Sequence, residues 1–257
     1  MRRRKKSKTK KRIIVFLAIF LFVLSLIGIL LSPIFELKKI SLYGNKEISS
    51  EELEKSIKSV NILLMTTNGL KDKLLKEFPK ISEVRIEKNI FKRTIAITIT
   101  ERKSLGIICK AEKSSPVETT KDGETIKNCF YIDKNGVIFE DAPQTSGSLV
   151  LLIKDFSSEE FSLGKKIFEE QIINSIVEIR ENLTSSTNIK IDWFENRTIP
   201  PKELKLVTSK GWYILFDSTR DIKKQLSILK TALSEKIKTT DNLEYIDLRI
   251  ENRIYYK

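Results

Sequence analysis

The stretch FPKISEVRIEKNIFKRTIAITITERK, residues 78–103, contains two segments in which apolar and polar side chains alternate. Val84 and Ile86 alternate with charged residues in the first segment, and isoleucines alternate with small or polar residues between positions 94 and 100 in the second. A period of two is typical of β-strands with one buried face. Because only residues 89–93 separate the two segments, we expect them to form an antiparallel hairpin.

The residues before this hairpin predict one further strand and two helices. The strand ends at a Gly-Asn turn at 44–45, and residues 49–52 form a capping box, which is typical of a helix start. A second helix is expected at residues 70–78, where the next residue, a proline, ends it. The order β-α-α-β-β indicates a small α+β domain at residues 36–103.

Residues 13–35, IIVFLAIFLFVLSLIGILLSPIF, contain no charged side chain. A helix of about nineteen such residues spans roughly 28 Å, close to the thickness of the hydrocarbon core of a membrane. A cleaved signal peptide is the alternative, but its apolar region is shorter and ends in small residues that this sequence does not offer. We therefore expect an uncleaved transmembrane helix.

The chain has 47 basic and 34 acidic residues, which gives a formal net charge of +13. Nine of the basic residues lie in the tail MRRRKKSKTKKR, residues 1–12, so the rest has 38 basic against 34 acidic residues, or +4. Positive charge beside an apolar helix favours a cytoplasmic N-terminus, which places residues 36–257 outside the cell membrane. The tail has no aromatic or Gly/Arg pattern, so we expect it to contact anionic lipid and not nucleic acid.

Residues 104–257 predict a second, β-rich domain with two helices that cover one face of its sheet. Asn135 and Gly136 mark a tight hairpin, which is flanked by two strands. Apolar residues at helical spacing predict one helix at 165–183 and another that runs from a cap at 218–221 to about Lys238. The other predicted elements are a strand at 103–110, a polar loop at 111–128, strands at 148–155, 188–196, 202–210 and 211–217, and a terminal strand.

The sequence has two cysteines, Cys109 and Cys129, at the ends of two strands that are expected to pair. A disulfide is permitted outside the membrane, and closing a loop of this length stabilises a fold by about 3 kcal/mol in the chain-entropy model. Two buried free thiols, acting as small apolar core residues, are the alternative. We favour the disulfide, and the sequence leaves both open.

The sequence shows no catalytic or metal-binding constellation. It has no histidine, which excludes His-dependent triads and HExxH zinc sites, and two cysteines alone do not make a structural zinc site. Residues 163–166 suggest a phosphate-binding loop but lack its Gly and its Ser/Thr. Glu101, Asp133 and Asp155 are carboxylates of the kind that glycosidases pair, yet nothing in their spacing brings two together. We expect no enzyme, metal, cofactor or small-molecule substrate.

Three short motifs follow one another in an order known from one protein family: IxLxGN at residues 40–45, FPKISEVRIEK at 78–88 and TITERK at 98–103. They resemble a POTRA domain, and the whole chain resembles the bacterial division proteins FtsQ and DivIB. Ser104 stands where this family usually has a proline. The resemblance implies a membrane-anchored scaffold at the division septum that links early and late division proteins and binds the FtsB/FtsL pair. A POTRA-type chaperone of the cell envelope is the alternative, although it would favour several POTRA copies.

The resemblance also implies partner-binding residues on the terminal strand: Arg249, Ile250, Asn252, Ile254 and Tyr256. We expect a partner segment to add to this strand by β-augmentation, in which main-chain bonds give affinity and alternate side chains give specificity. Arg249 is suited to bind a partner carboxylate through two hydrogen bonds, and Tyr256 is an aromatic anchor of the kind that dominates interfaces.

The alternation of YIDLRIENRIYYK, residues 245–257, limits how this terminal segment folds. A two-residue hairpin at 251–252 would mix the two faces, and a three-residue turn at 251–253 has no glycine for the left-handed position. We therefore expect one bent strand. Its first half, with Ile246 and Leu248, joins the domain core, and its second half forms an edge that is open to a partner.

Overall fold

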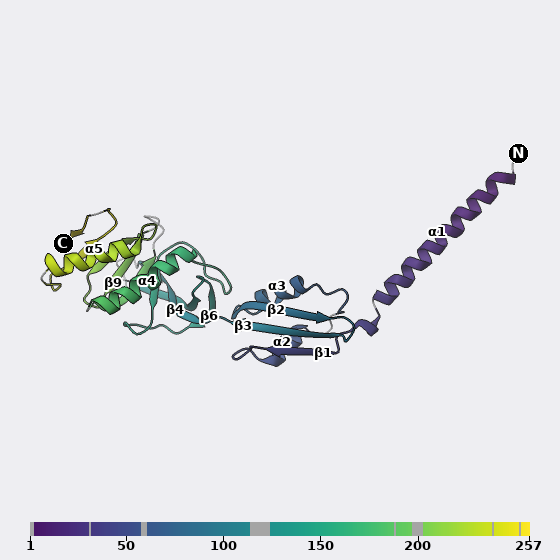
Figure 1. Ribbon diagram of the computed structural model, residues 1–257, viewed down its shortest axis with the longest axis horizontal. Coiled ribbons are helices and arrows are strands. Elements are labelled where there is room, and N and C mark those ends of the chain that lie inside the picture. Colours follow the sequence, from purple (N-terminus) through teal and green to yellow (C-terminus); the bar gives the residue numbers. More distant parts are fainter. Residues whose placement is uncertain are drawn as a thin grey trace. The chain divides into compact units, whose positions relative to one another are not determined.

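The computed structural model describes residues 3–30, 32–57, 61–113, 124–187, 189–196, 203–237, 239–251 and 253–257. The chain divides into two compact units, Met1–Glu101 and Arg102–Lys257 (Figure 1). Each unit has a hydrophobic core of its own. Each unit is therefore described by itself.

The chain begins with the helix α1, Arg3–Leu30. It contains an apolar stretch, Arg12–Ile29, which is long enough to cross a membrane and has no residue buried inside the protein. A helix that is apolar on all sides is stable in lipid rather than in water. The helix ends before the predicted boundary at residue 35, because Pro33 interrupts it and opens the short 3₁₀ helix η1, Pro33–Phe35.

The first unit contains a three-stranded sheet in the order β1-β3-β2. The central strand β3 is parallel to β1 and antiparallel to β2. Two helices lie between β1 and β2 in the chain, so the predicted order β-α-α-β-β and the α+β class are confirmed. The elements are β1 (Lys39–Tyr43), α2 (Ser50–Ile57), α3 (Thr67–Glu77), β2 (Ile81–Asn89) and β3 (Thr94–Glu101).

The core of the first unit lies between this sheet and its two helices. The alternation of β3 places its isoleucines in the core, and Leu53 of α2 and Leu74 of α3 pack in the same cluster. Helix α3 starts at Thr67, three residues before the prediction. Thr66 caps it, because its side chain accepts a hydrogen bond from the N–H of Gly69 at 3.2 Å.

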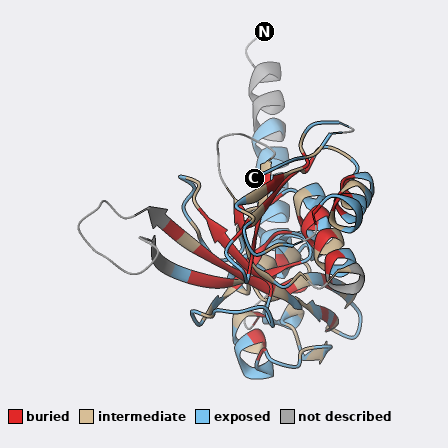
Figure 2. Cartoon of the chain, turned by 90° about the vertical axis from the view of Figure 1, so that its left-hand side faces the viewer, coloured by how far each residue is buried: buried red, intermediate tan, exposed pale blue. Residues whose placement is uncertain are grey.

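The second unit is built on a nine-stranded sheet in the order β12-β11-β10-β9-β8-β7-β4-β5-β6. As predicted, two helices, α4 and α5, pack on one face of this sheet and bury its main core (Figures 1 and 2). The elements are β4 (Ser104–Lys113), β5 (Glu124–Asp133), β6 (Ile138–Ala142), β7 (Leu152–Asp155), α4 (Glu170–Ser186), β8 (Ile191–Asn196), β9 (Glu203–Thr208), β10 (Tyr213–Asp217), α5 (Ile222–Glu235), β11 (Tyr245–Asp247) and β12 (Tyr255–Tyr256).

Two strand predictions in this unit have wrong boundaries. Both ends of the polar loop predicted at 111–128 are strand, because β4 continues to Lys113 and β5 already begins at Glu124, and residues 114–123 lie outside the described part of the chain. Cross-strand pairing extends this hairpin through residues that carry no apolar pattern. The strand predicted at 148–155 has only its last four residues in β7, where all four side chains are buried.

Helix α4 begins at Glu170 and not at the predicted residue 165. Ile167 and Phe168 have the right spacing for its apolar face, but they belong to a segment that bonds to the turn between β5 and β6. The N–H of Ile167 donates to the carbonyl of Gly136 at 2.8 Å, and Phe168 is buried there. The carbonyl of Lys165, which the first turn of a helix from residue 165 would use, instead accepts the N–H of Ile138 at 3.1 Å.

The sheet face opposite the two helices carries a smaller apolar cluster that includes Leu152 and Trp193. A disulfide joins Cys109 of β4 to Cys129 of β5 in this cluster. The two cysteines are register partners across the strands, with their Cα atoms 4.1 Å apart, and both are buried. The bridge therefore links the strands of the hairpin directly.

The prediction of one bent terminal strand is wrong. After β11 the chain reverses, and β12 pairs with β11 in the antiparallel direction, with Ile246 opposite Tyr256. Residues 248–254 connect the two strands. The two- and three-residue turns considered above would each have fixed which side chains face one another across the strands. A longer connection does not fix that pairing, so the objections to the short turns do not apply to it. Ile246 and Leu248 are buried in the main core, as expected.

Candidate partner-binding edge

The large sheet ends at the segment that runs from β11 to Lys257, which we call the terminal edge. Lys257 and Tyr245 exchange two backbone hydrogen bonds, of 3.2 and 3.3 Å. Hydrogen-bonded and non-hydrogen-bonded pairs alternate along an antiparallel ladder, so the neighbouring pair of Ile246 and Tyr256 is of the non-hydrogen-bonded kind. The N–H and C=O of Tyr256 therefore point away from β11, toward the open side of the sheet.

Exposed apolar and aromatic side chains lie at the terminal edge. Ile250, Tyr255 and Tyr256 each have between 44 and 48% of their surface exposed. Ile254 instead packs against the main core, so it holds the returning chain to the domain. Asn252, another predicted binding residue, lies outside the described residues. Ile250 and Tyr256 are thus the predicted residues that the structure leaves available for contact.

Arg249 is bound inside its own domain by two carboxylates. Its Nε and Nη2 donate to the two carboxylate oxygens of Asp247 at 2.9 and 2.6 Å, and its Nη1 donates to Glu203 at the start of β9. Hydrogen bonding to Asp247 and the negative charges of both partners raise the pKa of Arg249, although burial opposes this. The two-bond contact that the sequence suggested for a partner carboxylate is therefore made with Asp247.

Asp247 stabilises the start of the reversal. Its carboxylate also accepts the backbone N–H of Arg249 at 3.0 Å. Burial raises the pKa of Asp247, but the hydrogen bonds and charge of Arg249 outweigh that effect and lower the pKa below its ordinary value. The carboxylate therefore stays charged at neutral pH and keeps this contact.

Arg220, which precedes α5, contacts the terminal edge, and this role was not predicted from the sequence. Its Nη1 donates to the backbone carbonyl of Arg249 at 2.7 Å, and its Nη2 lies 3.7 Å from a carboxylate oxygen of Glu251. These contacts join positions about thirty residues apart, and no local spacing relates them. Arg220 fixes the reversing segment to the body of the domain.

Two of the carboxylates considered for catalysis have structural partners. Glu101 accepts the backbone N–H groups of residues 46–48 at 2.8 to 3.1 Å within the first unit. Asp133 accepts a hydrogen bond from Arg102 at 2.6 Å, together with backbone N–H groups of the turn that follows it. Each carboxylate therefore fixes the conformation of a turn.

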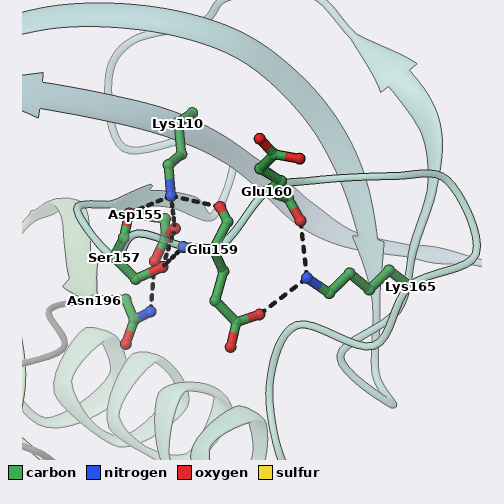
Figure 3. A network of polar contacts seen from close by, with 7 residues as sticks. All are labelled: Lys110, Asp155, Ser157, Glu159, Glu160, Lys165 and Asn196. Carbon is green, nitrogen blue, oxygen red and sulfur yellow. Dashed lines mark hydrogen bonds and ion pairs between the residues drawn. The ribbon is translucent and has the colours of Figure 1, made fainter.

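Asp155, the last residue of β7, is fully buried and has a similar role in the polar network that Figure 3 shows. It accepts hydrogen bonds from Lys110 at 2.9 Å, Ser157 at 2.7 Å and Asn196 at 2.5 Å. Lys110 also donates to the backbone carbonyls of Ser157 and Glu159. The network connects β4, β7 and β8 to the loop that follows β7.

A hollow of about 850 Å³ lies in the second unit, beside the turn between β9 and β10 and the end of α5. Lys190, Lys210 and Lys230 line it, and Lys210 binds the lining Asp241 at 2.9 Å. Trp212 also lines it, and its buried Nε1 has no hydrogen-bond partner in the described part of the chain. Asp241 is the one carboxylate among the described lining residues, and it is engaged by Lys210.

Two comparisons with known proteins agree with each other. Residues 35–102 match the family model of the FtsQ-type POTRA domain. The chain is also 26% identical, over 234 residues, to the cell division protein DivIB of Clostridium acetobutylicum. That alignment covers 87% of this chain and 83% of the relative, so the similarity extends well beyond the POTRA domain.

Proposed function

Because the chain belongs to the FtsQ/DivIB family of bacterial cell division proteins, we propose that it is a non-catalytic scaffold of the division machinery. The α1 helix anchors it in the cell membrane with the N-terminus in the cytoplasm, and both outer domains lie on the other side, at the division septum. Its role there is to link early and late division proteins. Its partners include a pair of the FtsB/FtsL kind.

The observation that carries this proposal is the terminal edge. The N–H and C=O of Tyr256 face away from β11, and three apolar or aromatic side chains beside them are half exposed. An extended partner segment that pairs with β12 would satisfy these backbone groups and cover the side chains, which is the geometry of β-augmentation. The partner strand therefore adds to β12, because the chain's own tail already covers β11.

The geometry gives Arg249 a different role from the one implied by the family resemblance. Its guanidinium is engaged by Asp247 and Glu203, and Arg220 binds its carbonyl. Arg249 therefore acts as a positioning residue that sets the path of the tail. Ile250 and Tyr256 make the direct contacts with the partner.

The test compares two substitutions at one position. Tyr256→Pro removes both the side chain and the outward N–H, whereas Tyr256→Ala removes only the side chain. We expect both to weaken binding of a purified FtsB/FtsL pair to the full chain, and the proline variant to bind at least about tenfold more weakly than the alanine variant, a difference of about 1.4 kcal/mol. Surface plasmon resonance measures both affinities.

Deletion of residues 254–257 is the second arm, because it removes the whole of β12. We expect loss of binding with the outer domains still folded, as judged by circular dichroism. Unchanged binding in the deletion variant would rule out the edge mechanism. A membrane pull-down tests the wider function: division proteins support the scaffold, and a mixture of unfolded polypeptides would support the POTRA-type chaperone instead.

A further inference from the structure

The POTRA domain has an uneven distribution of exposed apolar side chains. Within the described residues from 32 to 101, five large apolar side chains are exposed. Four of them, Ile34, Leu64, Ile90 and Phe91, lie on three segments that the chain brings together, and we call these four the proximal patch. Phe91 is fully exposed and Ile34 is 66% exposed.

Hydrogen bonds join the three segments of the proximal patch. The Nη1 of Arg93, in the turn between β2 and β3, donates to the carbonyl of Ile34 at 2.6 Å. The N–H of Lys38 donates to the carbonyl of Arg93 at 2.9 Å, and the N–H of Ile62 donates to the carbonyl of Phe35 at 2.9 Å. The segments that carry the proximal patch therefore lie next to one another in the folded domain.

The chain connectivity places this surface close to the membrane. Helix α1 ends at Leu30, and Ile34 follows four residues later. Four residues reach at most about 14 Å even when they are fully extended. The interfacial layer between hydrocarbon and water is roughly 5 to 8 Å deep on each side of a bilayer. The proximal patch therefore begins within or beside that layer, whatever angle the helix takes.

The turn that carries Phe91 has a defined backbone. Arg93 has a φ of 54°, a conformation that residues other than glycine rarely adopt, and the side chain of Asn89 accepts the N–H of Lys92 at 2.9 Å. Phe91 is presented at the tip of this turn and contributes nothing to the core. Lys92, next to it, is exposed and has no ion-pair partner in the described residues.

We propose that the proximal patch is a second membrane contact, in which Phe91 and Ile34 enter the lipid interface and Lys92 pairs with anionic headgroups. An exposed aromatic side chain flanked by a cation is the combination that interfacial anchors use. The contact would fix the POTRA domain on the lipid surface, so that the domain is oriented by two points and not by α1 alone.

The test places a tryptophan at the tip of the turn in the full-length chain. Phe91→Trp is reconstituted into phosphatidylcholine vesicles with phosphatidylglycerol, in which a fraction of the lipids is brominated near the headgroup end of the acyl chains. We expect a blue-shifted emission and strong quenching, at least about twice that of the control. Tyr43→Trp is the matched control, because Tyr43 is the fifth exposed residue and lies at the far end of β1, about 13 Å along the strand from its start.

The unsubstituted chain gives the background from Trp193 and Trp212, which both lie in the second unit. Equal quenching of the two tryptophan variants would overturn the proposal. A blue shift at position 91 without bromine quenching would also overturn it, because the side chain would then be covered by protein. Phe91 makes no core contact, so the variant is expected to melt at the temperature of the wild type.

Discussion

Single charged side chains fix several turns of this protein. Glu101, the last residue of β3, accepts three backbone N–H groups from the turn after β1. Arg220 does the opposite for the terminal reversal, because it donates to a backbone carbonyl. In both cases one side chain binds backbone groups that are distant in sequence, and its loss removes the bonds that hold the turn in place.

Glu101 makes the stability of the POTRA domain depend on pH. Burial opposes its charge, but the N–H groups of Ile48, Lys46 and Glu47 outweigh burial and lower the pKa of Glu101 below the ordinary value of 4.5. The stabilisation is therefore complete above about pH 5 and is lost as the pH falls through the lower folded-state pKa. We expect Glu101→Gln to cost about 1 to 2 kcal/mol at pH 7 and to remove this acid-dependent part.

Urea unfolding between pH 3 and pH 7 measures this effect. Glu83→Gln is the control, because Glu83 is exposed on β2 and its ion pair with Arg85 lies at the surface, so its replacement changes stability little. An unchanged acid dependence in the Glu101 variant would show that other carboxylates cause it.

The β4–β5 hairpin is an element whose stability depends on a covalent bond. The disulfide joins Cys109 to Cys129, which are 20 residues apart in the sequence. We expect the variant with both cysteines replaced by alanine to lose about 3 kcal/mol of unfolding free energy. The full chain in detergent, unfolded with urea in the presence and absence of a reductant, provides the measurement.

In that experiment the reductant should destabilise the wild type and leave the variant unchanged. Intact mass after non-reducing alkylation tests the bond itself. Two alkylated thiols in the wild type would contradict the disulfide.

Elements that are defined by contacts between residues close in sequence were predicted well, and elements that depend on residues distant in sequence were not. The strand β3 follows directly from its alternating isoleucines, and the proline at position 79 set the end of α3 to within one residue. The start of α4 was mispredicted because Ile167 has helical spacing but bonds to Gly136, and that contact is not local. A sequence pattern indicates the local periodicity of a segment. It does not indicate which distant segment packs against it in the fold.

The terminal edge shows the same limit at the site. The segment that carries the site was identified from the family resemblance. The burial of Ile246 and Leu248 was predicted from the alternation of apolar and polar residues along this segment. Its reversal was missed, because it depends on contacts of Arg249 with Glu203 and Arg220, which lie 46 and 29 positions away. In the sequence, Arg249 is a charged residue at a polar position of an alternating strand. That pattern does not indicate that its carboxylate partners lie within the same domain.

For the whole molecule, the basic tail is expected to determine the orientation in the membrane. Residues 1–12 carry nine Lys/Arg, and only Lys38 and Lys39 follow soon after the apolar stretch. We expect replacement of all nine by Gln to leave a substantial fraction of chains inverted, because the charge difference across the helix is then reversed. Protease digestion of intact spheroplasts measures the exposed fraction of the outer domains.

A variant in which Lys38 and Lys39 are replaced instead is the control, and it should keep the wild-type orientation. If the tail variant also keeps that orientation, the outer domains and not the charges determine it.

The position of β11 and β12 in the chain has a consequence for biosynthesis. α1 and the POTRA domain are complete at Glu101, whereas the terminal edge needs residues 245–257. Because domains fold in the order in which they are synthesised, the anchor and the POTRA domain form while the ribosome is still translating the large sheet. A stalled or prematurely terminated chain would reach the membrane without β12, the strand to which we propose that the partner binds. Under the proposed function, partner recruitment therefore selects chains that were translated through Lys257.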